Sequence, residues 1–287
     1  MKDFIILTDS GTDFSKDMAA ELGVKVLDLV VMREGFEPTP NGEVDAKEFY
    51  AFLRAKKSAT TSAINSDTFA EAMEQIISEG KDVIYLGFSS GLSNTYNAGR
   101  IAAEEMREKY PDSKIYACDT LCASLGEGLL VYLAAKKRLA GATIDEVRDF
   151  VEQNKLKLCH EFTVDDLMFL KRGGRVSTTT ALIGTALGIK PVMHVDNEGH
   201  LIKVGTARGR RASIDALFDR LSERAIAPAE QTMFICHGDC IEDATYLSER
   251  LKNELGVKEV YIGYTGVVIG SHSGPNTLAV FYIGNER

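Results

Sequence analysis

The first half of the chain alternates short apolar runs with longer segments of helical periodicity. Runs rich in β-branched and aromatic residues predict buried strands at 3–8, 24–31, 83–86 and 114–118. Apolar residues that recur every three or four positions predict helices at 18–22, 46–54, 66–79, 96–106 and 123–139. Strictly alternating strands and helices indicate βαβ units, so we expect a mainly parallel sheet with flanking helices in this half.

The pattern changes after a helix predicted at 144–153. Two apolar runs, 190–195 and 200–204, flank the turn sequence Asp196-Asn-Glu-Gly199 and predict a β-hairpin. Further periodic segments predict helices at 180–187, 211–224 and 241–255 and strands at 231–237 and 258–264. Hairpins mixed with helices favour a mixed or antiparallel sheet that carries helices. We therefore expect an α/β fold of two domains, residues 1–157 and 158–287.

Composition narrows the class of protein. A chain of 287 residues with 45% hydrophobic residues can bury the cores of two domains. Its net charge of −9 argues against a general nucleic-acid-binding protein, which needs a basic face. The first residues have no apolar segment followed by a cleavage site, and no apolar run approaches the length of a membrane span. We expect a cytoplasmic protein.

Five cysteines, an odd number in a chain without a secretion signal, predict free thiols. Cys118 and Cys122 share a C-x-x-x-C spacing with Cys236 and Cys240, and His237 lies beside the second pair. Zinc sites of the ribbon type usually have the tighter C-x-x-C spacing. We therefore expect no metal and no cofactor.

The strand at 83–86 runs into a serine-rich turn and then into a helix, with Ser93 placed to cap the helix start. Free backbone N–H groups and the positive end of the helix dipole make such a turn a seat for an anion. The same turn, 87–91, also matches the G-x-S-x-G pattern of serine hydrolases, with Ser89 as nucleophile and His237 or His272 as base. No oxyanion-type glycine loop precedes it, and both interpretations stay open.

Hydrogen-bond donors gather in four places along the chain: 60–62, 89–93, 173–175 and 271–273. Hydroxyl groups and an arginine without an evident general base suit the binding of a carboxylate or phosphate better than attack on a carbonyl. A P-loop, G-x-x-x-x-G-K-[ST], is not present, so nucleotide binding of that type is excluded.

These donor clusters belong to a longer series of motifs, which runs in order over nearly the whole chain. The motifs are Asp9-Ser10, Thr61-Ser62, Phe88–Tyr96, Asp119-Thr120 with Ser124–Gly128, Leu167–Arg175, Ile189–Pro191, Arg208–Arg211 and Gly270–Pro275. Together they resemble the DegV family of fatty-acid-binding proteins. The resemblance implies two α/β domains with an acyl chain held between or just beneath them. It also implies a non-catalytic carrier, which presents a long-chain fatty acid to a partner fatty-acid kinase that makes the acyl phosphate.

Carried over by position, the resemblance implies a carboxylate site at Thr61, Ser62, Ser93 and His272, with Arg175 close by. Ala63-Ile64 and Asn94 depart from the family pattern beside this site. Apolar residues near the motifs are candidates for the acyl-chain pocket: Ile64, Leu92, Ile183, Leu187, Ile189 and Met193. Basic residues near the motifs are candidates for docking an acidic face of the kinase: Lys171, Arg172, Arg208, Arg210 and Arg211.

Overall fold

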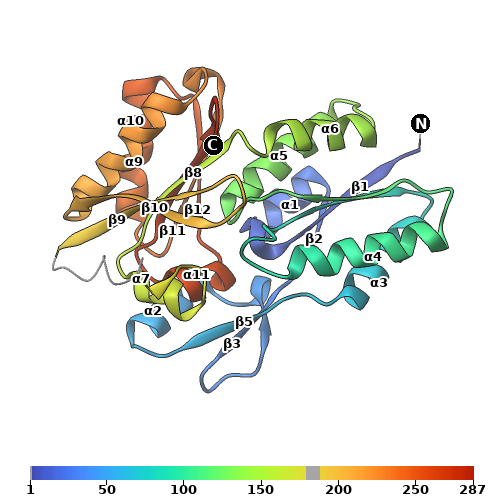
Figure 1. Ribbon diagram of the computed structural model, residues 1–287, viewed down its shortest axis with the longest axis horizontal. Helices are drawn as coiled ribbons and strands as arrows, with labels where there is room; N and C mark the ends of the chain where they lie inside the picture. The colour runs from blue at the N-terminus through green and yellow to red at the C-terminus, as the bar shows by residue number, and fades with distance from the viewer. Residues whose placement is uncertain (1, 179–187) are drawn as a thin grey trace.

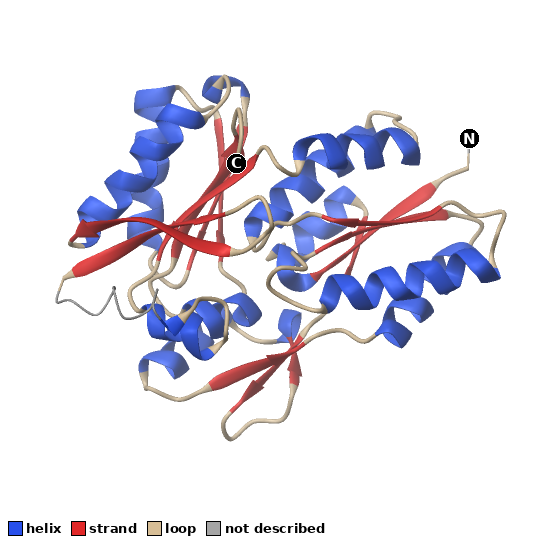
Figure 2. Ribbon diagram, in the orientation of Figure 1, coloured by secondary structure: helices blue, strands red, loops and turns tan. Residues whose placement is uncertain are grey.

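The computed structural model describes residues 2–178 and 188–287 and has three sheets (Figures 1 and 2). A parallel sheet forms the centre of the N-terminal part, and a mixed sheet forms the centre of the C-terminal part. A small antiparallel sheet lies at one side. The predicted helix at 180–187 lies outside the described residues.

The N-terminal sheet has the strand order β2-β1-β6-β7, and every neighbouring pair is parallel, as the alternation of strands and helices predicts. Its strands are β1 Phe4–Asp9, β2 Val24–Leu27, β6 Asp82–Gly87 and β7 Ile115–Asp119. Its helices are α1 Lys16–Leu22, α3 Ser66–Ser78, α4 Thr95–Lys109, α5 Leu125–Leu139 and α6 Ile144–Asn154. Helices α3 and α4 cover one face, and α5 and α6 lie on the other (Figure 2). The carboxyl ends of β1 and β6 point toward the C-terminal part.

The small sheet corrects the prediction of one strand over 24–31. That segment forms two strands in different sheets, because Asp28 and Leu29 leave the ladder of β1. Leu29 instead donates its N–H to Ser10 Oγ at 2.9 Å and accepts from Asn41 N at 2.8 Å. The sheet consists of β3 Val30–Arg33 between β4 Thr39–Pro40 and β5 Ala59–Ser62, with α2 Ala46–Arg54 and short 3-10 turns at Ser10–Thr12 and Asn41–Glu43 nearby.

The C-terminal sheet has the order β10-β9-β8-β13-β11-β12. Its strands are β8 Leu158–Thr163, β9 Ile189–Val195, β10 Leu201–Arg208, β11 Thr232–His237, β12 Glu259–Tyr264 and β13 Leu278–Ile283. The predicted hairpin is confirmed as β9 and β10, and β11 pairs with β12 in parallel, whereas the other described pairs are antiparallel. Two helices, α9 Arg210–Arg224 and α10 Ile241–Leu255, cover one face. The remaining elements are α7 Leu167–Arg172, a 3-10 turn at Pro228–Glu230 and α11 Val267–Ser273.

Helix α5 lies between the two large sheets and packs against both (Figure 1). On one side of α5, the ring of Tyr132 lies 5.4 Å from the ring of Phe234 in β11. On the other side, Gly128 of α5 lies close to the backbone of Thr12 in the N-terminal part. One hydrophobic cluster includes Ile6 and Ile84 from the parallel sheet and Phe281 from the mixed sheet. The core is therefore continuous across the two parts. The domain boundary near residue 157 stays a prediction.

Candidate functional site

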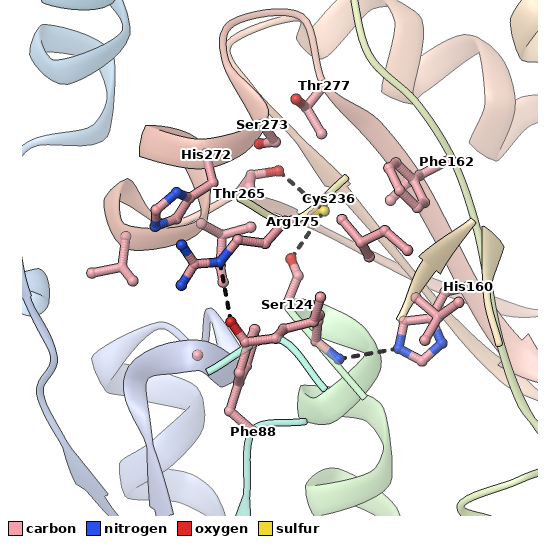
Figure 3. A pocket seen from close by; sticks show the side chains of 18 of the residues that line it. Phe88, Ser124, His160, Phe162, Arg175, Cys236, Thr265, His272, Ser273 and Thr277 are labelled. Atoms are coloured by element: carbon pink, nitrogen blue, oxygen red, sulfur yellow. Dashed lines mark hydrogen bonds between the residues drawn. The ribbon is translucent and has the colours of Figure 1, made fainter. Parts of the chain in front are cut away.

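A cavity lies where the carboxyl ends of β1 and β6 meet α11 and the mixed sheet (Figure 3). It holds about 820 Å³ of empty space, part of which is open to solvent. Most of its wall is apolar: Leu29, Phe88, Leu92, Phe162, Leu170, Val195, Leu201, Val268, Ile269, Ala279 and Phe281.

Four residues that the sequence singles out as carboxylate ligands line this cavity: Thr61, Ser93, Arg175 and His272. Thr61 lies in β5 and Ser93 in the β6–α4 loop, whereas Arg175 lies in the turn after α7 and His272 lies in α11. The fold therefore brings them together from four separate segments. Figure 3 shows Arg175 and His272 side by side, with Phe162 and His160 across the cavity from them. The structure thus places these donors along an apolar space, and their role in binding a carboxylate stays a prediction.

Arg175 is a half-buried cation that forms no ion pair with any residue the structure describes. Its Nε donates to the carbonyl of Leu92 at 3.1 Å, and its Nη1 donates to the carbonyl of Gly173. Burial lowers the pKa of Arg175 from its usual value. Within the described part of the chain, this partly desolvated guanidinium has carbonyl acceptors and no counter-charge, so this wall of the cavity favours an anion.

His272 is neutral at physiological pH, because burial and the neighbouring charge of Arg175 lower its pKa to about 4. Its Nε2 lies 2.8 Å from the hydroxyl oxygen of Thr61. In the tautomer with hydrogen on Nε2, the imidazole donates to Thr61 and leaves the threonine hydroxyl free to donate to a ligand. The pair can therefore supply a donor to a carboxylate without adding a second buried charge.

Ser93 does not cap α4 in the predicted way. The helix begins at Thr95, and its N-cap is Asn94, which makes no side-chain capping bond. Instead, Ser93 Oγ accepts from Thr95 N at 3.2 Å and lies 2.9 Å from Thr95 Oγ1. When Thr95 is the donor of the second bond, the Ser93 hydroxyl hydrogen is free for a ligand.

The remaining predicted site residues are divided between the cavity and other parts of the structure. Among the described residues, Leu92 lines the cavity, whereas Ser62 is exposed and does not. Ile64 and Met193 are buried in the hydrophobic cores, and Ile189 is half-buried in β9. Ile183 and Leu187 fall outside the described residues.

Strand residues that the sequence analysis did not select form much of the wall opposite Arg175. Phe162 in β8 and Ala279 in β13 are register partners, and Phe281 follows two residues later on the same face. The period-2 alternation of β13 could have indicated this shared face. It could not have separated the wall of a cavity from an ordinary core, because both are apolar and buried.

The predicted docking residues differ in what they contact. Arg210 is engaged within the chain, since its Nε lies 2.8 Å from Asp243. Arg211 lies over the ring of Tyr246, and Arg172 lies over the ring of Phe169. Arg208 is exposed and Lys171 is half-buried.

Ser89 is fully buried, and both of its hydroxyl bonds go to backbone groups. Its Oγ donates to the carbonyl of Gly199 at 2.9 Å and accepts from Gly91 N at 3.2 Å. In the described part of the chain, no histidine hydrogen-bonds to it. The geometry therefore does not provide the base that a serine nucleophile requires.

Residues 2–178 and 188–287 contain no group of three or more His, Cys, Asp or Glu side chains arranged to hold a metal ion. None of their helices combines the length and the apolar character that a membrane crossing requires.

Comparisons with known proteins agree with the resemblance. The model of the DegV family matches residues 3–285. A DegV domain-containing protein of Clostridium perfringens is 47% identical over 100% of this chain and 99% of its own length. The structure of a DegV family protein from Thermus thermophilus, described as fatty-acid binding, is 28% identical, covers 99% of this chain and 100% of its own, and has a TM-score of 0.86. The structure of DegV from Bacillus subtilis, described as a fatty acid binding protein, is 26% identical over 99% of this chain and 100% of its own, with a TM-score of 0.85. This chain belongs to the DegV family.

Proposed function

We propose that the cavity binds a long-chain fatty acid, with the carboxylate at Thr61, Ser93, Arg175 and His272 and the alkyl chain along the apolar wall. The observation that carries this proposal is Arg175, a half-buried cation that lines an apolar cavity without an ion-pair partner among the described residues. A ligand with one negative charge and a long apolar tail matches both features. The fatty-acid-binding proteins of Thermus thermophilus and Bacillus subtilis, which share this fold, support the same ligand class.

The two ends of such a ligand are stabilised by different interactions. Each buried methylene contributes roughly 0.8 kcal/mol, so the tail supplies most of the affinity. The carboxylate leaves water when the tail enters, and this loss must be offset by hydrogen bonds. Arg175 can add charge-assisted bonds, while Thr61 and Ser93 add neutral donors.

The test is to identify what the purified protein holds and what stabilises it. We expect organic extracts of the denatured protein to contain a long-chain fatty acid by mass spectrometry. Palmitate added to delipidated protein should raise the melting temperature, because a ligand that binds only the folded state stabilises it by mass action. Octyl glucoside is the control for non-specific effects of an amphiphile. If the extracts contain no fatty acid and palmitate leaves the melting temperature unchanged, the proposal is wrong.

We further propose that the protein is a non-catalytic carrier, which presents the carboxylate to a fatty-acid kinase for acyl-phosphate formation. Exposed Arg208 and Arg211 would steer an acidic face of the kinase, because basic residues stand out on a chain with a net charge of −9. Arg210 is less suited to this role, since it already pairs with Asp243. Lys171 and Arg172 form a second basic segment, at the end of α7.

The carrier proposal is tested with the fatty-acid kinase of the same organism. Arg208→Glu with Arg211→Glu should slow acyl-phosphate formation, most strongly at low salt, and leave palmitate affinity unchanged. Exposed Lys136 and Lys137 on α5 offer a matched control, because their change to Glu alters the net charge by the same amount. Equal turnover of both variants at low salt would place the docking surface elsewhere.

A further inference from the structure

The β9–β10 turn, residues 196–199, lies directly against the β6–α4 loop of the N-terminal part. Ser89 Oγ donates to the carbonyl of Gly199 at 2.9 Å. A Cβ placed on Gly91 would come within 2.8 Å of the carbonyl oxygen of Glu198, and a Cβ on Gly199 would overlap Ser89 Oγ. We call this the turn contact. It is a backbone-to-backbone approach that depends on two glycines and one buried hydroxyl.

Arg287 holds the same turn from another side. Its Nη1 donates to the carbonyl of Leu121 at 2.6 Å and to the carbonyl of Asp196 at 3.1 Å. Its Nε donates to the carbonyl of Leu158 at 3.0 Å. One guanidinium thus ties the turn to the loop that follows β7 and to the start of β8.

The segments joined by the turn contact are also walls of the cavity. Val195 and Leu201 flank the turn, and Phe88 and Leu92 flank the loop around Ser89; all four line the cavity. A shift of the turn away from Ser89 would therefore draw apart two apolar walls. Ser89 itself does not line the cavity, so it can act only through these neighbours.

We propose that Ser89 is a positioning residue, whose hydrogen bond to Gly199 holds the β9–β10 turn against the β6–α4 loop and slows release of the bound acyl chain. This inference rests on the proposed fatty-acid binding. It also assigns a use to the serine of the G-x-S-x-G pattern, which is buried and bonded to backbone groups.

The internal hydrogen bonds of the turn make the effect of Ser89 specific. Asp196 Oδ1 accepts from Glu198 N at 3.0 Å and from His200 N at 2.9 Å, so the turn keeps its own shape without outside help. Loss of the Ser89 hydroxyl leaves the Gly199 carbonyl without this donor. The expected result is a turn of unchanged shape that is less firmly held against the loop.

The experiment compares Ser89→Ala with Ser90→Ala, the same change at an adjacent, exposed serine. Carbon-13 palmitate is loaded on delipidated protein, and its transfer to phosphatidylcholine vesicles is timed. We expect roughly tenfold faster transfer from Ser89→Ala, the effect of about 1.4 kcal/mol that the loss of one such hydrogen bond produces. Ser90→Ala should release palmitate like the unchanged protein. Equal rates for all three proteins would overturn the inference.

A second pair of variants approaches the contact from the other side. Gly199→Ala places a methyl group against Ser89 at a φ of +79°, and Gly141→Ala provides the same backbone strain at a φ of +94° with nothing within 4 Å. The inference is supported if Gly199→Ala transfers palmitate faster and Gly141→Ala does not. This pair of variants is the test of the turn contact if Ser89→Ala fails to fold. Similar transfer from both glycine variants counts against it.

Hydrogen exchange separates this inference from the proposed function. Amide exchange in residues 196–200 should accelerate in Ser89→Ala relative to Ser90→Ala, with or without palmitate, because the turn is less firmly held. If the unchanged protein binds no palmitate, the proposed function fails, whereas the exchange result still tests the turn contact. Unchanged exchange, or labelling of Ser89 by a fluorophosphonate probe, would refute the positioning role.

Discussion

Replacing Arg175 with Met should weaken fatty-acid binding while leaving the ligand-free protein almost as stable as before. The substitution keeps an unbranched apolar side chain and removes the half-buried guanidinium. In the ligand-free protein it removes the hydrogen bonds to the carbonyls of Leu92 and Gly173. It also removes a desolvated cation that has no ion-pair partner among the described residues, and the penalty for burying such an ion can reach several kcal/mol.

These two contributions oppose each other in the ligand-free protein. Hydrogen bonds of a charged group contribute about 1.5–3 kcal/mol, which is comparable with the desolvation of a half-buried ion. We therefore expect the free energy of unfolding to change by no more than about 1 kcal/mol. With ligand bound, the lost charge-assisted bonds to the carboxylate cost about 1.5–3 kcal/mol, or roughly a ten- to hundredfold increase in Kd.

Urea unfolding of delipidated protein gives the first quantity, and competition with a fluorescent fatty acid gives the second. Arg172→Met is the matched control, because Arg172 ends α7 just before this turn and stacks on Phe169 in an exposed position. The control should retain its affinity. An unchanged Kd for Arg175→Met, or a loss of ligand-free stability as large as the loss of binding energy, would refute the reasoning.

Three further predictions concern the cavity and its surroundings. Thr61→Val combined with Ser93→Ala removes two neutral donors that contribute about 1 kcal/mol each, so the affinity for palmitate should fall more than tenfold while the ligand-free melting temperature stays similar. An unchanged affinity would show that neither residue binds the carboxylate. The pKa of His272 is about 4 in the folded protein, whereas the unfolded chain takes up that proton near pH 6.5. The contribution of His272 to stability should therefore decline by about 3 kcal/mol as the pH falls through this window, and urea unfolding of His272→Gln should lack that decline. Burial raises the pKa of Asp13 to about 7, so the folded protein keeps a proton that the unfolded chain loses above about pH 4, and the contribution of Asp13 to stability should decline as the pH rises toward 7. Asp13→Asn should make the free energy of unfolding depend less steeply on pH in this window, whereas an unchanged slope would exclude the carboxyl as a source.

The elements with strong periodicity follow from local sequence, and the exceptions have physical causes. Ser15 caps α1, and Gly23 ends it in the left-handed conformation, because both effects are local to the helix ends. The split near Asp28 could not be read from the apolar run, since it depends on hydrogen bonds to Ser10 and Asn41 from distant turns. Strand β5 is polar and takes its position from pairing with β3.

The residues of the candidate site are harder to predict from the sequence than the helices and strands of the fold. Thr61 lies in a strand, Arg175 in a turn and His272 in a short helix. Donor-rich segments of the sequence pointed to each of them, and the family resemblance then grouped them into one site. Among the described residues Arg175 has no counter-charge, and Ser89 bonds to Gly199. Both features depend on the tertiary arrangement of residues far apart in the chain. No periodic pattern in the sequence predicts either feature, because the local structure around each residue forms without the contact to the distant residue.

The position of α5 between the two large sheets limits how a ligand can enter. A hinge motion that separated the parts would expose side chains such as Leu129, Phe234 and Phe281, which are at most 2% accessible. At about 1.5–3 kcal/mol for each side chain, these three alone would cost roughly 5–9 kcal/mol, a large share of the stability of a typical protein. Entry and exit of an acyl chain should therefore proceed through displacement of surface loops, while the helix and both sheets remain a single rigid frame.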